Sequence, residues 1–284
     1  MYKIGWIGLG KMGEPMCRQL IGAGYPVVVY NRSKGKEEAL KVLGAVVASS
    51  PASLMQQADV IFLMVSDDQA VSGIFNGEQG LLQAKTTGKL LINMSTVSPS
   101  ISKVLAPLCK QQGNNYLDAP VSGSVKQAEE RQLVIMAGGD ETTFERAKPI
   151  LEKLGKLVMR VGPTGAGNAT KLAMNILLAF YTQGLAEAVI FAKRHDIRTE
   201  DFMALVNISA MGSPFIKMKG DAIMENNYRA AFALKHLAKD LRLAKSEGLA
   251  TPLGEVAFRT FQQAEPAFGE DDIIAVIRQL NPAQ

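Results

Sequence analysis

The sequence predicts an α/β fold, in which a doubly wound parallel sheet occupies the first half of the chain and a long helix leads to an all-helical second half. Apolar strands alternate with helices from Lys3 to Val161, a pattern typical of parallel sheets covered by helices on both faces. From Gly162 to Arg194 the residues are mostly apolar, and no proline follows Pro163. Beyond Arg194 the pattern is helical, with no convincing strand.

Composition and charge limit the classes of protein to consider. Of the 284 residues, 47% are hydrophobic and 20% charged, as in soluble globular proteins with one large domain or two ordinary ones. The net charge of +4 is small and spread out, which argues against nucleic-acid binding but suits an anionic cofactor or substrate. Cys17 and Cys109 stand apart and the only histidines are His195 and His236, so we expect no metal site and a packing role for both thiols. We expect no signal segment, no membrane partner and a cytoplasmic location.

A glycine-rich turn follows the first predicted strand. Lys3 to Ile7 is predicted to be a strand and Glu14 to Ala23 a helix, and the sequence between them reads GxGxxG. Gly8 would allow the tight turn, Gly10 would let a pyrophosphate approach the backbone, and Gly13 would let helix and strand pack closely. The free N–H groups at the start of the helix would face the phosphates. The motif in this context predicts dinucleotide binding.

The residues after the second predicted strand, Val27 to Tyr30, indicate which dinucleotide is preferred. An NAD site usually has an acidic residue here to hold the ribose 2′-hydroxyl. This chain has Asn31, Arg32 and Ser33 instead. Arg32 could pair with a 2′-phosphate or stack on adenine, and Ser33 could donate a hydrogen bond. We therefore expect NADP rather than NAD, with an ordinary basic loop as the alternative.

The alternation of strands and helices continues through the first half. Ser50, Asp67 and Ser98 are predicted to cap the helices that follow them. The other predicted elements are helices over 37–43, 51–58 and 142–154 and strands over 45–48, 60–65, 89–93, 133–136 and 157–161.

Parallel sheets bind ligands at the carboxyl ends of their strands, and several predicted strands end in polar or glycine-rich segments. We expect these segments to form one cofactor groove along a single edge of the sheet. The predicted cofactor-binding residues are Gly8, Leu9, Gly10, Lys11, Met12, Gly13, Asn31, Arg32, Ser33, Met64, Val65, Ser95 and Thr96.

The long helix carries a lysine that needs an explanation. A helix that is apolar nearly all round is expected to be buried, yet Lys171 lies in its first turns and Asn175 one turn later on the same face. Lys171 could extend along the surface to water or could serve a buried site. Gly162 to Gly165 is the best domain boundary, which divides the chain into 1–162 and 163–284. Further helices are predicted over 199–206, 213–224, 234–247, 252–263 and 271–278.

Four motifs resemble one family, the β-hydroxyacid dehydrogenases. They are GLGKMGEPM from Gly8, DAPVSGS from Asp118, GAGNATKLAMN from Gly165 and LKHLAKDLRLA from Leu234. The resemblance covers essentially the whole chain, and the joint match is more specific than any single motif. It implies a Rossmann domain for cofactor binding, a helical domain for substrate binding and dimerisation, and a catalytic lysine on the interdomain helix, which is Lys171 here.

Details of the second motif favour one branch of the family. Many members read SGGxxGAxxG after the proline and valine, but this chain has Ser124, Gln127 and Arg131 at the positions of those later glycines. That departure, the NRS after the second strand and the segment from Phe232 to His236 resemble the glyoxylate/succinic semialdehyde reductases. The branch implies NADPH-dependent reduction of short aldehyde acids such as glyoxylate and succinic semialdehyde.

The residue types suit this reaction. Ser122 and Gly123 could hold the substrate carboxylate with a hydroxyl and main-chain N–H groups, although the segment could also be a plain tight turn. Lys171 could protonate the carbonyl oxygen as hydride arrives, if burial and neighbours weaken its hold on the proton. Asn175 could orient the same oxygen, and Thr96 is a further hydroxyl donor near the nicotinamide.

The resemblance assigns three residues of the second half. It implies that Lys239 lies on the cofactor side, that Asp240 belongs to the substrate pocket and that Phe232 forms a pocket wall. Without the resemblance, either charge could lie on a solvated helix face. We assign no catalytic role to either histidine.

Other functions are compatible with parts of this pattern. A 3-hydroxyisobutyrate or tartronate semialdehyde enzyme would be a close alternative. A dehydrogenase-like binding module without redox activity, or an imine reductase, would be expected to lack the lysine at position 171. We expect a homodimer or homotetramer, because a helical domain built around one long helix often forms the subunit interface.

Overall fold

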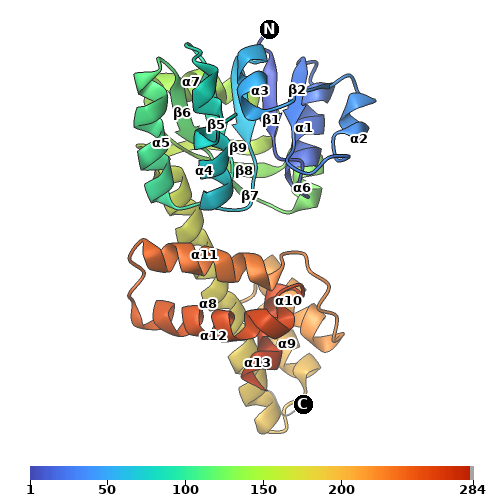
Figure 1. Ribbon diagram of the computed structural model, residues 1–284. Helices are drawn as coiled ribbons and strands as arrows, with labels where there is room; N and C mark the ends of the chain where they lie inside the picture. The colour runs from blue at the N-terminus through green and yellow to red at the C-terminus, as the bar shows by residue number, and fades with distance from the viewer. Residues whose placement is uncertain (282–284) are drawn as a thin grey trace. The chain divides into compact units, whose positions relative to one another are not determined.

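The computed structural model describes residues 1–281, and Figure 1 shows their helices and strands. The chain forms two compact units, Met1–Lys171 and Leu172–Gln284. The division falls inside the long helix α8 (Ala166–Arg194), a few residues after the boundary predicted at Gly162 to Gly165. The start of the helix belongs to the first unit because its main chain is hydrogen-bonded to Asp118 of that unit.

The first unit is built on a nine-stranded sheet. Its central strands are parallel, β8 is antiparallel to β6 and β7, and β9 is parallel to β8. The predicted doubly wound α/β fold is therefore confirmed, with the strand order of dinucleotide-binding sheets. In spatial order the strands are β3 (Val46–Val47), β2 (Val27–Tyr30), β1 (Ile4–Ile7), β4 (Val60–Leu63), β5 (Leu90–Asn93), β6 (Asn115–Asp118), β8 (Leu133–Gly138) and β7 (Val121–Ser122), with β9 (Gly155–Gly162) beside β8.

Three helices of the first unit begin at the caps that the sequence predicted. The side chains of Ser50, Asp67 and Ser98 accept hydrogen bonds from main-chain N–H groups three residues later, at 3.1, 2.8 and 3.1 Å. The helical elements are α1 (Gly13–Gly22), α2 (Glu38–Lys41), α3 (Pro51–Gln57), α4 (Asp68–Asn76), η1 (Leu81–Ala84), α5 (Pro99–Gln111), α6 (Val125–Glu129) and α7 (Glu141–Leu151).

Strands β6 and β7 and helix α6 were not predicted. β6 begins with Asn115 and ends with Asp118, and its two apolar residues are too few to give a periodic signal. β7 has two residues and α6 five, so pairing with β8 and local capping decide their structure rather than intrinsic preference.

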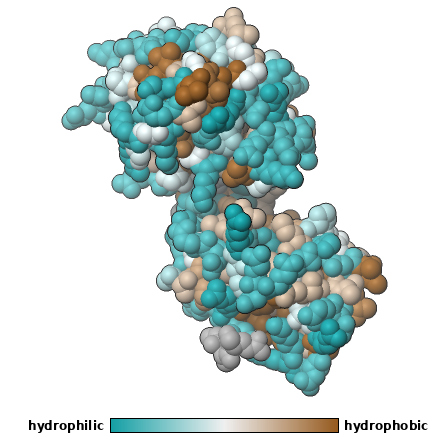
Figure 2. All heavy atoms as spheres, turned by 90° about the vertical axis from the view of Figure 1, so that its right-hand side faces the viewer, coloured by the Kyte–Doolittle hydropathy of each residue, from teal (hydrophilic) through white to brown (hydrophobic). Residues whose placement is uncertain are grey.

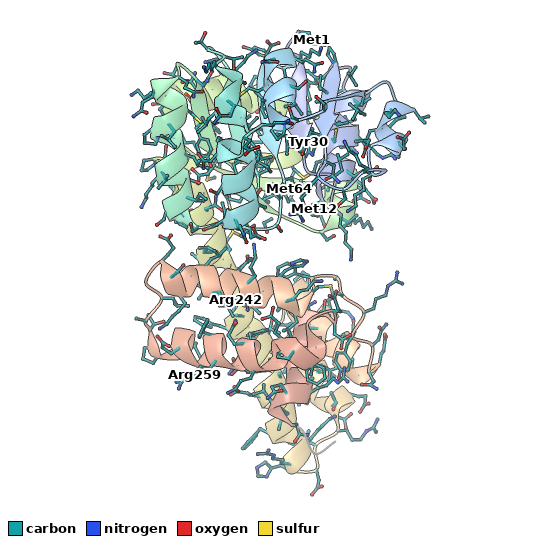
Figure 3. The ribbon with its side chains drawn as sticks, in the orientation of Figure 1. Met1, Met12, Tyr30, Met64, Arg242 and Arg259 are labelled. Atoms are coloured by element: carbon teal, nitrogen blue, oxygen red, sulfur yellow. The ribbon has the colours of Figure 1, made fainter. Side chains whose placement is uncertain are left out.

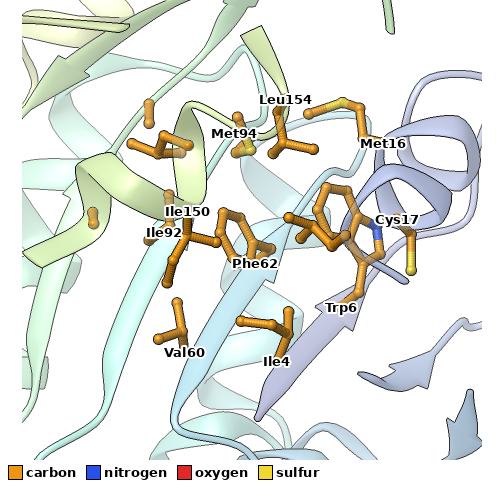
Figure 4. Packing of buried hydrophobic residues seen from close by; sticks show 14 of the residues in the cluster. Ile4, Trp6, Met16, Cys17, Val60, Phe62, Ile92, Met94, Ile150 and Leu154 are labelled. Carbon is orange, nitrogen blue, oxygen red and sulfur yellow. The ribbon is translucent and has the colours of Figure 1, made fainter. Parts of the chain in front are cut away.

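A hydrophobic core lies on each face of the sheet. One contains Ile4, Trp6, Phe62 and Ile92 and is covered by α1, α6 and α7; the other is covered by α3, α4 and α5. Trp6 and Phe62 stack with ring centroids 5.3 Å apart, and Figure 4 shows them side by side in the first core. Cys17 and Cys109 are buried in these cores, and burial raises the pKa of the Cys109 thiol to about 12, which is typical of a packing residue.

The regular elements of the second unit are all helices among the residues that the structure describes. Its core joins α8, α10, α11 and α12, with Phe261 among its fully buried side chains. α12 runs to Phe268, beyond the predicted end, and Asp272 caps a short 3₁₀ turn where one continuous helix was predicted. The elements after α8 are α9 (Thr199–Ile208), α10 (Pro214–Met224), α11 (Leu234–Ser246), α12 (Pro252–Phe268), η2 (Ile273–Ala275) and α13 (Val276–Leu280).

The expectation that α8 is buried all round was only half right. One face packs into the second core through Ala179, Ala186 and Val189. On another face, side chains spaced three to four residues apart are exposed, including Tyr181 at 52% and Phe191 at 65%. By length and composition α8 could also cross a membrane, a criterion that the core helix of a soluble protein often meets. Composition cannot tell which apolar face the rest of the chain covers.

Hydrophilic residues cover most of the face seen in Figure 2, and hydrophobic residues form only separate clusters on each unit. Scattered exposed apolar side chains of this kind are normal for a protein surface. Over both units, the exposed apolar side chains include Val42, Val46, Ile208 and Met211.

Candidate functional site

The glycine-rich turn between β1 and α1 has the geometry of a dinucleotide-binding turn. Gly8 has a φ of +98°, and a Cβ there would lie 2.2 Å from the carbonyl oxygen of Met64. A Cβ on Gly13 would lie 2.1 Å from the carbonyl oxygen of Gly8. A Cβ on Gly10 would meet nothing within 4 Å, so the chain leaves space there. The first and third glycines are therefore needed for folding, and the second leaves room for an incoming group, as pyrophosphate binding requires.

Side chains hold this turn in place from two directions. The buried indole of Trp6 donates a hydrogen bond to the carbonyl oxygen of Gly8 at 2.9 Å. Asn31 accepts a hydrogen bond from the Leu9 N–H at 2.9 Å and donates one to the Ser33 carbonyl oxygen at 2.7 Å. Asn31 therefore does more than avoid a negative charge, because it ties the basic loop after β2 to the glycine-rich turn. Arg32 and Ser33 are exposed beside it.

The strand register brings the predicted cofactor segments to one edge. Ile7 pairs with Tyr30 and with Leu63, Leu63 pairs with Asn93, and Asn93 pairs with Asp118. The carboxyl ends of β1, β2, β4, β5 and β6 are thus aligned. Figure 3 labels Met12, Tyr30 and Met64 at this edge. The other predicted cofactor residues of the first unit, Lys11, Val65, Ser95 and Thr96, directly follow these strands or lie in the glycine-rich turn.

A buried polar chain fixes the two loops that follow β4 and β5. The Val65 N–H donates to the Ser95 hydroxyl at 2.9 Å, and the Ser95 N–H donates to the Asn93 side-chain oxygen at 3.1 Å. Asn93 in turn donates to the Tyr116 hydroxyl at 3.2 Å, which also contacts Ser102. Ser95 is fully buried, so its contribution is to hold the Val65 and Thr96 segments in place.

Ser122 and Gly123 lie on and directly after β7. Gly123 has a φ of +144°, and a Cβ there would lie 2.8 Å from Leu133, so only glycine fits. Ser124 and Gln127 form a capping box at the start of α6. These two residues replace glycines of the family pattern and give the loop after Gly123 a defined structure.

Arg131 stands at the third glycine position of the family pattern, and its contacts show how a residue other than glycine is accommodated there. Its φ is +57°, in the left-handed region that favours glycine. Its guanidinium donates to the Gln19 side-chain oxygen at 2.7 Å, and Gln19 donates to the Glu129 carbonyl oxygen at 2.7 Å. These contacts between α6 and α1 offset the strained backbone.

Asp118, the first residue of the DAPVSGS motif, is the main site residue that the sequence analysis missed. It is fully buried, and its carboxylate accepts hydrogen bonds from the N–H groups of Gly165 at 2.7 Å and Asn168 at 2.9 Å. Burial raises the pKa of Asp118, and these N–H groups oppose the rise. A Cβ on Gly138 or Gly167 would lie within 3 Å of this carboxylate, so both glycines permit the close approach. Strand β6 therefore supplies the N-terminal cap of α8.

Asn168 connects the same helix turn to the loop after β5. Its side-chain oxygen accepts a hydrogen bond from the Val97 N–H at 3.0 Å, and the side chain is fully buried. Thr96 directly precedes Val97, and Lys171 follows Asn168 by three residues. Asp118 and Asn168 thus set the start of α8, and with it the position of Lys171, against the strand ends of the first unit. The sequence signal that could have revealed this contact is Asn168, a polar residue in the first turn of a long and mostly apolar helix.

The second unit carries its own polar cluster. Asn175 on α8 donates through Nδ2 to the Asp240 carboxylate on α11 at 2.5 Å, and Lys239 lies 3.0 Å from the same carboxylate. Asn175 and Asp240 are both buried. Because only the amide nitrogen can donate to a carboxylate, the bond fixes the orientation of the Asn175 amide. One Asn175 N–H is thus used within the protein.

Phe232 precedes α11 and is partly exposed, with its ring stacked on His236 at 6.1 Å. Partial burial and two nearby lysines lower the pKa of His236. Each unit thus holds its own set of predicted site residues. The first holds the cofactor segments with Ser122, Gly123 and Lys171, and the second holds Asn175, Phe232, Lys239 and Asp240.

Comparison with known proteins agrees with this geometry. Residues 3–162 match the model of the NAD-binding domain of 6-phosphogluconate dehydrogenase. Residues 165–280 match that of the NAD-binding region of NADP-dependent 3-hydroxyisobutyrate dehydrogenase. The chain belongs to the β-hydroxyacid dehydrogenase family. Like other members, this β-hydroxyacid dehydrogenase is an NAD(P)-dependent oxidoreductase that acts on CH–OH groups of small molecules.

Individual relatives of this β-hydroxyacid dehydrogenase differ in substrate. The chain is 33% identical to glyoxylate/succinic semialdehyde reductase 2 of Arabidopsis thaliana, over 99% of its own length and 80% of the relative's. It superposes on the 3-hydroxyisobutyrate dehydrogenase of Mycobacterium tuberculosis with a TM-score of 0.91, 28% identity and 99% coverage of both chains. A structure of Psf3 in complex with NADP⁺ superposes with a TM-score of 0.86 and 26% identity, covering 98% of this chain and 99% of the other.

Two glycine substitutions separate cofactor binding from folding. Gly10→Ala places a methyl group in open space, so we expect an unchanged melting temperature but a dissociation constant for NADPH raised about tenfold or more, measured by fluorescence titration. Gly13→Ala is the matched comparison, because its methyl group overlaps the Gly8 carbonyl oxygen and should lower the melting temperature by several degrees. Wild-type NADPH affinity in folded Gly10→Ala would contradict this assignment of the turn.

Proposed function

We propose that this β-hydroxyacid dehydrogenase is an NADPH-dependent glyoxylate/succinic semialdehyde reductase, which reduces short aldehyde acids to hydroxy acids. The observation that carries the proposal is the placement of Lys171 on the α8 turns whose start is bonded to Asp118. Asp118 also leads directly into the Ser122–Gly123 segment. Strand β6 and the segment after it thus hold both the proposed proton donor, Lys171, and the proposed anion-binding turn at Ser122 and Gly123. An aldehyde acid needs both groups, because it carries a carboxylate and a carbonyl.

Each reacting group has an assigned partner. A bound nicotinamide would supply the hydride that the carbonyl carbon takes up, and the C=O π electrons would pass to the carbonyl oxygen. Lys171 donates a proton to that oxygen and completes the alcohol. Ser122 and Gly123 hold the substrate carboxylate with the hydroxyl and main-chain N–H groups. Thr96 donates a hydrogen bond beside the nicotinamide.

Residues of the second unit contribute to substrate and cofactor binding. Asn175 uses its second N–H to orient the carbonyl oxygen, because Asp240 already accepts the first one. Asp240 thereby acts in the substrate pocket mainly through Asn175. The family resemblance assigns Phe232 to the substrate pocket and Lys239 to cofactor binding.

NADP is the proposed cofactor. Arg32 and Ser33 are exposed after β2, and Asn31 fixes the loop that carries them. No acidic side chain occupies 31–33, where one would repel a 2′-phosphate. The guanidinium of Arg32 supplies the matching positive charge.

A 3-hydroxyisobutyrate or tartronate semialdehyde enzyme is the second candidate, and the close superposition with a 3-hydroxyisobutyrate dehydrogenase favours it. Ser124, Gln127 and Arg131 favour the first candidate, because they replace glycines of the common family pattern. A binding module without redox activity is disfavoured by Lys171. NADPH consumption with glyoxylate, succinic semialdehyde, tartronate semialdehyde and methylmalonate semialdehyde separates the two enzyme candidates.

We also propose that the enzyme is a cytoplasmic homodimer or homotetramer. Met174, Leu177, Tyr181 and Phe191 form an exposed apolar face on α8, which a second copy of the chain could cover. Two buried thiols without a disulfide among the described residues suit a reducing compartment.

Removal of the proton donor tests the mechanism. Lys171→Ala should lower kcat with aldehyde acids by about 10²-fold to 10⁴-fold, because the carbonyl oxygen loses its acid. The NADPH dissociation constant should stay within about twofold of wild type, since the glycine-rich turn is unaltered. Lys171→Arg, which keeps the charge but donates a proton poorly, is the matched control and should be similarly slow. Near-wild-type turnover in Lys171→Ala would disprove the assigned role.

Cofactor preference is tested by comparing kcat/KM for NADPH and NADH. Wild type should favour NADPH, and Arg32→Ala should reduce that preference about tenfold while leaving NADH use nearly unchanged. Lys36→Ala, on the same exposed loop, is the control and should change the ratio little. A clear NADH preference in wild type would overturn the assignment.

The subunit interface is tested by sedimentation velocity. Wild type should sediment as two or four chains, and the double variant Leu177→Asp/Tyr181→Asp should shift toward monomers because it charges the exposed face of α8. Val104→Asp alters an equally exposed apolar residue of the first unit and should leave the mass unchanged. A monomeric wild type, or an oligomer that survives the double variant, would contradict the proposal.

A further inference from the structure

A buried ion pair lies inside the second unit, and neither of its two residues has been assigned to the reaction so far. Lys219 on α10 and Asp272 before η2 are each 3% exposed, with Nζ and Oδ1 2.6 Å apart. Burying two charges costs desolvation energy that their attraction often fails to recover. Such a pair is therefore weak evidence for stability, and its other contacts indicate what it does.

Those contacts run to the segment that carries Phe232. Asp272 Oδ2 accepts hydrogen bonds from the N–H groups of Ala231 at 3.0 Å and Phe232 at 3.3 Å. Its Oδ1, which pairs with Lys219, also accepts from the Ile274 N–H at 3.1 Å. One carboxylate thus joins α10, the 3₁₀ turn and the chain before α11.

The main chain holds the same segment from its other side. The Ile273 N–H donates to the Phe232 carbonyl oxygen at 3.0 Å, and the Asp272 N–H donates to the Tyr228 carbonyl oxygen at 2.8 Å. Both polar groups of the Phe232 main chain are therefore fixed by Asp272 and its neighbour. Residues 227–232 form no helix or strand, so these bonds replace those that regular structure would supply.

We propose that Asp272, held by Lys219, is a positioning residue that sets the Phe232 ring as a wall of the aldehyde-acid pocket and so determines affinity for the substrate. This inference rests on the proposed role of Phe232 in binding the aldehyde acid. The ring is partly exposed, stacks on His236 and packs at the edge of the second core, and the main chain that carries it is fixed by Asp272 and Ile273. Lys219 donates to Oδ1 of the carboxylate and so leaves Oδ2 facing the two N–H groups.

Three variants separate positioning from stability. Lys219→Met leaves a carboxylate that still accepts from Ala231 and Phe232, but removes its cation, so the melting temperature should fall. Asp272→Asn keeps the shape but loses an acceptor for those N–H groups. Lys219→Met/Asp272→Leu removes both charges and both acceptor oxygens, so its melting temperature should exceed that of either single variant while the segment stays unheld.

Steady-state kinetics below the lowest melting temperature give the first readout. The KM for the aldehyde acid should rise about tenfold to a hundredfold in Asp272→Asn and in the double variant, because a wall displaced by about 1 Å loses its fit. It should stay within about threefold of wild type in Lys219→Met, with the KM for NADPH unchanged in all three. A substrate KM that follows the melting temperature, or does not change, overturns the proposal.

Hydrogen exchange at Ala231 and Phe232 gives a second readout that needs no activity. Protection should be lost in Asp272→Asn and in the double variant, and kept in Lys219→Met. Equal protection in all variants overturns the proposal even if KM changes.

Phe232→Ala and wild-type turnover keep this result distinct from a failure of the proposed function. If wild type does not reduce aldehyde acids, the proposed function fails, and hydrogen exchange still decides whether Asp272 holds the segment. If wild type is active but Phe232→Ala leaves the substrate KM unaltered, the proposed function survives and the link from Asp272 to substrate affinity is wrong.

Discussion

The hydrogen bonds between the Asp118 carboxylate and the first turn of α8 are the interaction on which the rest of the site depends. They join the last parallel strand of the sheet to the helix that carries Lys171. A buried carboxylate at a helix N-terminus is favoured by the positive end of the helix dipole. The cap therefore places the helix at the sheet edge and meets the cost of burying Asp118.

This cap connects two parts of the proposed site in the first unit, the segment with Ser122 and Gly123 and the start of the helix that carries Lys171. The chain leaves Asp118 toward Ser122 and Gly123, while Asn168 ties the same turn of α8 to the Val97 main chain beside Thr96. The segment that leads to Ser122 and Gly123, the main chain beside Thr96 and the helix turn before Lys171 thus share one buried anchor. Such sharing suits a reaction in which proton donor and substrate must be held within a fraction of an ångström.

Local sequence patterns predicted the fold of the first unit well. The glycine-rich turn, the alternating apolar strands and the caps at Ser50, Asp67 and Ser98 follow from local rules, and the fold was predicted from them. The family was predicted from the resemblance of four motifs along the chain. The anchors at Asp118 and Asp272 were missed as contacts, because each joins main-chain groups distant in sequence. β7 and α6 were missed for a related reason, since tertiary pairing outweighs propensity in elements of a few residues. The exposed face of α8 was missed for a similar reason. The spacing of apolar residues does not tell which apolar face of a helix the rest of the chain covers.

The most direct test of this account is the rate of hydride transfer to an aldehyde acid in single-turnover experiments with Asp118→Asn. The substitution keeps the size of the side chain but replaces one acceptor oxygen with an N–H₂ group that cannot accept from α8. The account predicts a rate lowered about a hundredfold at saturating substrate, with NADPH affinity within about twofold of wild type and the protein folded at the assay temperature. A folded Asp118→Asn enzyme that transfers hydride at the wild-type rate would contradict it.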